Sequence, residues 1–151
     1  MLTATKGGKI NISEEKDTKS VAEKFSKLIK QGDFILLSGN LGVGKTTFIK
    51  YIIQEFQKKN KLKQTEVTSP TFNLLNEYKI KEIKINHYDL FRLKSNEEVK
   101  NLDLFIDTKN SITLIEWPQI IKEKPRNLIE FIFEYKDNHE KRFLNIKGLD
   151  F

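Results

Sequence analysis

The sequence predicts a three-layer α/β fold built on a mixed β-sheet, and three observations support this prediction. The apolar run 34–37 leads directly into a glycine-rich loop, which is followed by a helical pattern of apolar residues. A second apolar run, 112–115, has the length and composition of a buried strand. In the C-terminal half, the strand patterns 128–135 and 141–146 flank a turn at 136–138 and predict a hairpin of antiparallel strands.

The first part of the chain predicts a short strand at 8–12 and a helix at 18–31, which Gly32 closes. This helix is expected to bury one side, formed by Ser20, Ala22, Phe25, Leu28 and Ile29. A second helix is expected at 45–60, after the strand at 34–37. Its apolar residues follow the i, i+3, i+4, i+7 spacing of one helix face, at Ile49, Ile52, Ile53 and Phe56.

The middle of the chain predicts a solvated connector, two paired strands and a short helix. The connector is the lysine-rich segment 58–64. The segments 74–80 and 83–88 are expected to pair as antiparallel strands around the turn at 81–82. Ser95 and Glu98 have the spacing of a capping box and predict a short helix that runs through Leu102.

The strongest functional signal lies between the strand at 34–37 and the helix at 45–60. Residues 39–46 match the phosphate-loop pattern G-x-x-x-x-G-K-[ST] in full. In such a loop, glycines let successive backbone N–H groups converge on phosphate oxygens, while the lysine reaches the β- and γ-phosphates and the hydroxyl faces Mg²⁺. The segment therefore predicts a site for one nucleoside triphosphate and one Mg²⁺, formed by Gly39, Asn40, Leu41, Gly42, Val43, Gly44, Lys45, Thr46 and Thr47.

Two carboxylates follow predicted strands and are candidates for the metal and the chemistry. Glu116 comes directly after the apolar run 112–115, where a Walker-B acid is expected, and Asp89 follows the strand at 83–88. Because ligands in open α/β sheets bind beyond the carboxyl ends of the strands, both side chains are expected to face the Mg²⁺.

Two further features are candidates for the same site. The segment 69–72, Ser-Pro-Thr-Phe, places two hydroxyls beside a proline and has the character of a loop that senses the γ-phosphate. A plain turn is the alternative for this segment. Trp117, the only tryptophan, adjoins Glu116. For this residue both a packing role and a role in the site stay open.

Length and composition limit the class of protein. At 151 residues, with 38% hydrophobic residues, the chain predicts one domain over residues 1–151 with a buried core. It has no cysteine, which excludes disulfides, iron–sulfur clusters and cysteine-based zinc sites. No apolar run approaches the roughly 20 residues of a membrane span, and residues 1–9 lack the apolar stretch of a signal peptide. We therefore expect a soluble cytoplasmic protein without a membrane partner.

The net charge of +6 raises the question of nucleic-acid binding. Lysine accounts for almost all of the excess, because the 27 basic residues include only the arginines Arg92, Arg126 and Arg142. Arginine binds phosphates and bases better than lysine does. A solvated, lysine-rich surface is therefore the favoured interpretation, and a contact with RNA or an acidic partner stays open.

Four motifs together resemble those of the bacterial TsaE family, the small ATPase of tRNA threonylcarbamoyladenosine biosynthesis. Residues 39–47 resemble its phosphate loop, 69–72 its switch motif, 87–92 its His-x-Asp-x-Tyr-Arg box and 116–118 its metal motif. Weaker similarities at the edge of the nucleotide site involve Thr18 and Arg142. The sequence departs from the family pattern at three positions, with Phe91 for tyrosine, Asn40 for aspartate and Val43 for alanine.

The resemblance implies that Thr46 and Glu116 hold Mg²⁺, that Lys45 holds the phosphates and that Thr71 orders around the γ-phosphate. Asp89 would orient or deprotonate the attacking water, and the resemblance leaves both roles open. The implied activity is Mg²⁺-dependent ATP hydrolysis, slow alone and raised by partner proteins of the TsaD and TsaB type. These proteins transfer a threonylcarbamoyl group to the tRNA adenosine beside the anticodon, and the contact of this chain with tRNA is expected to be indirect.

Three alternatives are weighed against this hypothesis. A small-molecule kinase of the phosphate-loop class is the nearest, but no pair of arginines at the spacing of a lid is present. A GTPase needs an Asn-Lys-x-Asp motif, and residues 60–63, Asn-Lys-Leu-Lys, lack the aspartate. A non-catalytic RNA-binding module has only the lysine excess in its favour and lacks strands rich in aromatic residues.

Overall fold

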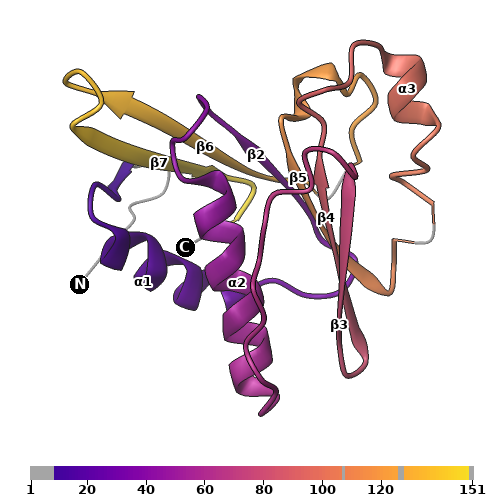
Figure 1. Ribbon diagram of the computed structural model, residues 1–151, viewed down its shortest axis with the longest axis horizontal. Coiled ribbons are helices and arrows are strands. Elements are labelled where there is room, and N and C mark those ends of the chain that lie inside the picture. Colours follow the sequence, from indigo (N-terminus) through magenta and orange to yellow (C-terminus); the bar gives the residue numbers. More distant parts are fainter. Residues whose placement is uncertain (1–8, 107, 126–127, 150–151) are drawn as a thin grey trace.

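A computed structural model describes residues 9–106, 108–125 and 128–149, which form a seven-stranded mixed sheet with helices on its faces (Figure 1). The strands are β1 (Lys9–Asn11), β2 (Phe34–Ser38), β3 (Leu75–Ile80), β4 (Ile83–Asp89), β5 (Ser111–Glu116), β6 (Leu128–Lys136) and β7 (Lys141–Lys147). Their order across the sheet is β1-β7-β6-β2-β5-β4-β3. The mixed α/β fold predicted from the sequence is confirmed.

The centre of the sheet is parallel and its edges are antiparallel. β2 pairs in parallel with β5 on one side and with β6 on the other, and β4 pairs in parallel with β5. The antiparallel pairs are β3 with β4 at one edge, and β6 with β7 and β7 with β1 at the other. Both predicted hairpins are therefore present. Because these central strands are parallel, the carboxyl ends of β2, β4 and β5 lie side by side at one end of the strands.

The helices divide between the two faces of the sheet (Figure 1). The helices α1 (Glu15–Ser26) and α2 (Lys45–Lys59) pack against each other over one face, whereas α3 (Asn96–Lys100) and the 3-10 turn η1 (Pro118–Ile120) belong to the other. The central strand β2 is apolar toward both layers. Ile35 and Leu37 pack in the core under α1 and α2, and Phe34 and Leu36 pack in the core on the opposite side.

A cluster of buried phenylalanines fixes α2 on the sheet. The Phe131 ring of β6 lies 4.4 Å from the Phe25 ring of α1 and 4.8 Å from the Phe48 ring of α2, measured between ring centroids. All three side chains are fully buried. Buried aromatic pairs in such tilted and edge-on arrangements add to the stabilisation from buried area. The cluster therefore fixes the N-terminal turns of α2, where the phosphate loop ends.

The first helix differs from its prediction at both ends. It spans Glu15–Ser26 rather than 18–31, and its buried side is formed by Thr18, Val21, Ala22, Phe25 and Ser26. Ser20 and Leu28, which were expected to be buried, are exposed. The N–H groups of residues 27 and 28 bond to carbonyls three residues back, so the α-helix ends there. Leu28 therefore no longer follows the spacing of the buried helix face. Gly32 does not cap the helix, because its N–H bonds to the carbonyl of Ser111 at the start of β5 (2.9 Å).

The remaining boundaries agree with the predictions to within a few residues. The predicted strand at 8–12 corresponds to β1, and Gly8 lies outside the described residues. Ser95 is the N-cap of α3, with its hydroxyl accepting from the N–H of Glu98 at 3.3 Å, but α3 ends at Lys100 rather than at Leu102. No helix in the described part of the chain is long and apolar enough to cross a membrane.

Candidate functional site

The loop 39–44 joins the end of β2 to the start of α2, beside the carboxyl ends of the neighbouring parallel strands. Its conformation needs glycine at Gly39, which has a φ of +145°. A Cβ at this position would lie 2.6 Å from the carbonyl oxygen of Phe133 in β6, so the loop runs directly against the neighbouring strand. Val43 is fully buried and anchors the loop from inside, whereas Leu41 is 72% exposed.

The Lys45 side chain bends back over this loop. Its Nζ donates a hydrogen bond to the carbonyl of Gly39 and lies 3.5 Å from the carbonyl oxygen of Asn40. The same Nζ lies 3.5 Å from the centroid of the Trp117 ring, a distance typical of a cation–π contact. Burial lowers the pKa of Lys45, and the negative charges of Glu116 and Asp89 oppose this shift. A buried cation therefore lies where bound phosphates would bring negative charge.

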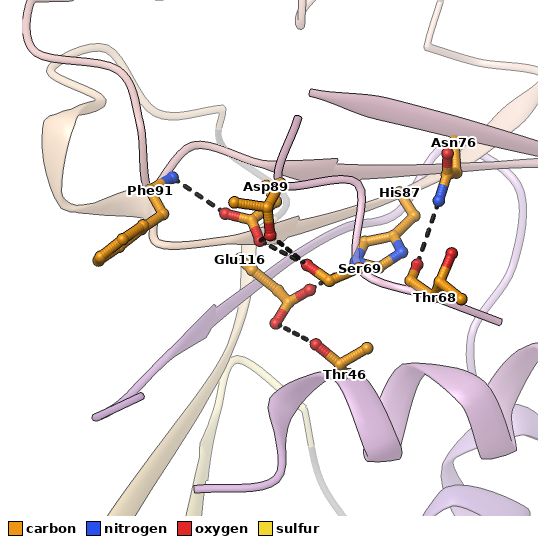
Figure 2. A network of polar contacts seen from close by, with 9 residues as sticks. Thr46, Thr68, Ser69, Asn76, His87, Asp89, Phe91 and Glu116 are labelled. Atoms are coloured by element: carbon orange, nitrogen blue, oxygen red, sulfur yellow. Dashed lines mark hydrogen bonds and ion pairs between the residues drawn. The ribbon is translucent and has the colours of Figure 1, made fainter. Parts of the chain in front are cut away.

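Thr46 and Glu116 meet at the start of α2 and the end of β5 (Figure 2). The Thr46 hydroxyl donates to Oε1 of Glu116 at 2.9 Å. The other oxygen, Oε2, lies 2.6 Å from Nε2 of His87, a fully buried residue of β4. Glu116 itself is 2% exposed, so both of its carboxylate oxygens are held by neighbouring side chains.

Asp89, at the end of β4, has a separate set of donors. Its Oδ1 accepts from the backbone N–H of Phe91 at 3.0 Å (Figure 2). Its Oδ2 lies 2.7 Å from the Ser69 hydroxyl and 3.1 Å from the Thr71 hydroxyl, and these two hydroxyls are 2.9 Å apart. The segment that contains Pro70 is therefore tied to the end of β4 by both of its hydroxyls.

Asp89 and Glu116 lie directly opposite each other on neighbouring parallel strands. Both are buried, so their mutual repulsion favours a cation nearby. Among the described residues, no group of three or more His, Cys, Asp or Glu side chains forms a metal cage. The pair Thr46 and Glu116 offers oxygen ligands only, which suits Mg²⁺, because this ion usually takes one or two protein ligands and completes its shell with phosphate oxygens and water.

A cavity of about 320 Å³ opens over these groups. Most of the residues predicted for the site line it, namely Leu41, Gly42, Gly44, Lys45, Thr46, Thr47, Thr71, Asp89, Glu116 and Arg142. Gly39, Asn40 and Val43 belong to the loop but are not part of the lining. The structure does not bring Thr18 to the cavity, because this residue is buried within α1.

Four residues that were not among the site residues predicted from the sequence take part in this site. Ser69, Phe91 and Trp117 line the cavity, and His87 contacts Glu116. The phenylalanine at 91 leaves the contact with Asp89 intact because the backbone N–H makes it. The signal for His87 was present in the sequence, since a residue two positions before Asp89 on a strand points to the same face.

The protein has a P-loop NTPase-like fold. Parallel strands flank the unit of β2, the phosphate loop and α2, and two carboxylates lie at the ends of neighbouring strands. The crystal structure of YdiB from Bacillus subtilis supports this fold, with a TM-score of 0.67 over 97% of this chain and 86% of that chain, at 23% sequence identity.

Comparison of sequences then identifies the family. The sequence model of threonylcarbamoyl adenosine biosynthesis protein TsaE matches residues 12–143. The chain is 42% identical over 141 residues to the tRNA threonylcarbamoyladenosine biosynthesis protein TsaE of Rickettsia typhi, covering 93% of this chain and 94% of that protein. It is 35% identical over 130 residues to the protein of the same name from Aquifex aeolicus, covering 86% and 90%. The chain belongs to the TsaE family.

Proposed function

We propose that this chain, as one domain over residues 1–151, binds ATP with Mg²⁺ and hydrolyses it in support of tRNA threonylcarbamoyladenosine biosynthesis. The observation that carries the proposal is the 2.9 Å contact between Thr46 and Glu116 at a cavity that Lys45 and Asp89 also line. The relatives from Rickettsia typhi and Aquifex aeolicus carry the name of that tRNA modification, and they supply the biological context.

The loop and the start of α2 would bind the triphosphate. Free N–H groups at a helix N-terminus favour anions, and the positive end of the helix dipole adds to this attraction. The Lys45 ammonium, which lies against the carbonyls of Gly39 and Asn40, would bind β- and γ-phosphate oxygens. Arg142 lies beside the loop, with Nη1 4.0 Å from the position that a Cβ of Gly44 would take, and would contact the edge of the nucleotide.

Thr46 and Glu116 are the residues that would hold Mg²⁺. Held there, the ion would supply positive charge to neutralise the negative charge that develops on the phosphates during phosphoryl transfer. The two side chains already lie within hydrogen-bond distance, so little rearrangement is needed to present both oxygens on one side of the cavity.

Asp89 would orient the attacking water or accept its proton. Its Oδ1 is held by the N–H of Phe91, which fixes the direction of the carboxylate. Its Oδ2 contacts Ser69 and Thr71. If Thr71 turns to the γ-phosphate, its hydroxyl leaves Asp89 and an acceptor position on Oδ2 becomes free for water. Nucleotide binding and activation of the carboxylate would thus be coupled through the segment 69–72.

We propose that partners of the TsaD and TsaB type raise a slow intrinsic rate of hydrolysis, and that contact with tRNA is indirect. Large apolar side chains near the cavity support a protein partner, because Leu41 is 72% exposed, Phe72 is 83% exposed and Phe91 is 53% exposed. Leu41 and Phe91 line the cavity, and Phe72 follows the lining residue Thr71. Exposed apolar patches are typical of surfaces that bind other proteins.

Phosphate release from ATP, with and without the partner proteins, tests this proposal. We expect Lys45→Ala and Glu116→Ala to weaken binding of nucleotide or Mg²⁺. Asp89→Ala is expected to bind ATP normally and to lose about 10²- to 10⁴-fold in turnover, the range for a group that assists proton transfer. The matched control is Glu97→Gln, which removes an exposed carboxylate from α3 and leaves the rate unchanged.

The outcomes separate the parts of the proposal. Normal hydrolysis by Asp89→Ala contradicts its catalytic role, and equal rates with and without partners contradict partner activation. Transfer of the γ-phosphate to a small acceptor, without release of phosphate to water, would instead favour the small-molecule kinase considered from the sequence.

A further inference from the structure

His87 lies beneath the cavity and contacts the carboxylate that faces it (Figure 2). Along β4, Ile85, His87 and Asp89 point to the same face of the sheet, because strand side chains alternate. The register pairs Asp89 with Glu116 and His87 with Leu114, so His87 is one pleat below Glu116 on the neighbouring strand. This placement brings the His87 Nε2 to 2.6 Å from Oε2 of Glu116.

The hydrogen bonding of the imidazole points to Glu116 alone. A carboxylate oxygen accepts, so Nε2 of His87 carries the hydrogen and donates. The other ring nitrogen, Nδ1, is buried and has no hydrogen-bond partner among the described residues. Among the described residues, Glu116 is therefore the one hydrogen-bond partner of this fully buried polar ring.

The surroundings of His87 are suited to an apolar side chain. Its neighbours on this face include Ile85 on the same strand and Leu114 on β5, both fully buried in the core under α1 and α2. A buried polar group in such a place lowers stability unless a hydrogen bond compensates for its lost hydration. The position thus favours a leucine or isoleucine for packing, and the histidine needs another explanation.

We propose that His87 is a positioning residue that fixes the carboxylate of Glu116 for the divalent cation. The bond from Nε2 holds Oε2, so that Oε1 points to the Thr46 hydroxyl and the cavity. The inference rests on the proposed ATP and Mg²⁺ site. Partners that orient a ligating side chain typically contribute about 10- to 100-fold to metal affinity. Without this hydrogen bond, the carboxylate of Glu116 adopts several side-chain conformers, and a smaller fraction of molecules has the conformer that binds the cation.

Binding of Mn²⁺, added as the chloride in the presence of ADP and followed by electron paramagnetic resonance, tests the inference without turnover. We expect His87→Leu to weaken Mn²⁺ about 10- to 100-fold. Its affinity for ADP in excess chelator should stay within about twofold of wild type, because the loop N–H groups and Lys45 are unchanged. In urea, His87→Leu is expected to remain folded, because the gain from an apolar side chain in apolar surroundings opposes the loss of the donor to Oε2 of Glu116.

Two amide variants keep the test decisive if His87→Leu does not fold. The amide nitrogen of glutamine matches the position of Nε2, so His87→Gln is expected to restore most of the Mn²⁺ affinity. The shorter His87→Asn places its amide near the position of Nδ1, cannot reach Glu116, and should bind Mn²⁺ as weakly as His87→Leu.

Three results overturn the inference. Mn²⁺ binding by His87→Leu or His87→Asn at wild-type strength shows that Glu116 needs no such partner. An equal loss of ADP affinity in chelator shows a general structural role. Equal Mn²⁺ binding by the asparagine and glutamine variants shows that the donor at Nε2 has no effect. Failure of the wild-type chain to bind ADP at all would instead overturn the proposed function.

Discussion

Replacing Gly39 by alanine tests whether the loop depends on its close approach to β6. The φ of +145° at Gly39 lies in a region that residues with a side chain rarely adopt, and such a conformation costs about 1–3 kcal/mol. The added Cβ would also lie 2.6 Å from the carbonyl oxygen and 2.9 Å from the Cβ of Phe133. Moving packed backbone apart adds about 1–3 kcal/mol. We therefore expect Gly39→Ala to lower the free energy of unfolding by about 4 kcal/mol.

Gly42→Ala is the matched control in the same loop. Gly42 also has a positive φ, +76°, but the nearest atom to its added Cβ is the Tyr135 hydroxyl at 3.5 Å, an ordinary contact. Only the backbone penalty of about 1 kcal/mol applies there. Urea unfolding measures the difference. With a slope near 2 kcal/mol/M, the midpoint of Gly39→Ala should lie about 1.5 M below that of Gly42→Ala.

The comparison of the two variants is decisive for the packing argument. Equal midpoints would refute it, because they would show that β6 moves to accept the new methyl group without a loss of stability. A Gly39→Ala chain that does not fold under conditions where Gly42→Ala does would agree with the expectation.

Two further predictions concern the two helices that cover the sheet. The hydrogen bond from Tyr51 to Glu15 (2.5 Å) raises the pKa of Tyr51 to about 12. A raised pKa stabilises the folded state below the ordinary value of about 10 and loses this effect as pH rises to about 12. In urea unfolding, Tyr51→Phe should therefore be less stable by about 1 kcal/mol near pH 8, and the difference should vanish near pH 12, whereas a constant difference would contradict the assignment. Phe131→Ala empties the fully buried ring position next to Phe48 and should lower the free energy of unfolding by about 3–5 kcal/mol, while Phe72→Ala, at an 83% exposed position, should change it by less than about 0.5 kcal/mol.

Much of the fold could be predicted because its signals are local. The segment 34–37 is a continuous apolar run, and 112–115 is apolar except for Thr113. The structure buries both of them in β2 and β5. The cap at Ser95 depends on residues three positions apart, and the structure confirms it. The end of the first helix was predicted wrongly. Its sequence continues a helical pattern through Ile29, and the bond of Gly32 to the start of β5 belongs to the tertiary structure.

The candidate site divides in the same way. Gly42, Gly44, Lys45 and Thr46 follow one another along the chain, so their common position at the cavity could be predicted from the motif alone. The placement of Glu116 and Asp89 beside them was expected from strand ends, and the structure brings both there. Thr18 was expected at the edge of the nucleotide site and does not line the cavity, since its position depends on how α1 packs.

The sequence by itself therefore determined the phosphate loop, because a loop of this kind depends on consecutive backbone N–H groups and the first turn of the helix that follows. It did not determine which polar groups hold the two carboxylates. The contacts of Glu116 with His87 and of Asp89 with Ser69 join residues 29 and 20 positions apart. The first contact exists only once β4 and β5 have paired in one register, which packing across the whole sheet sets rather than any local pattern. The second exists only once the segment 69–72 lies against the end of β4.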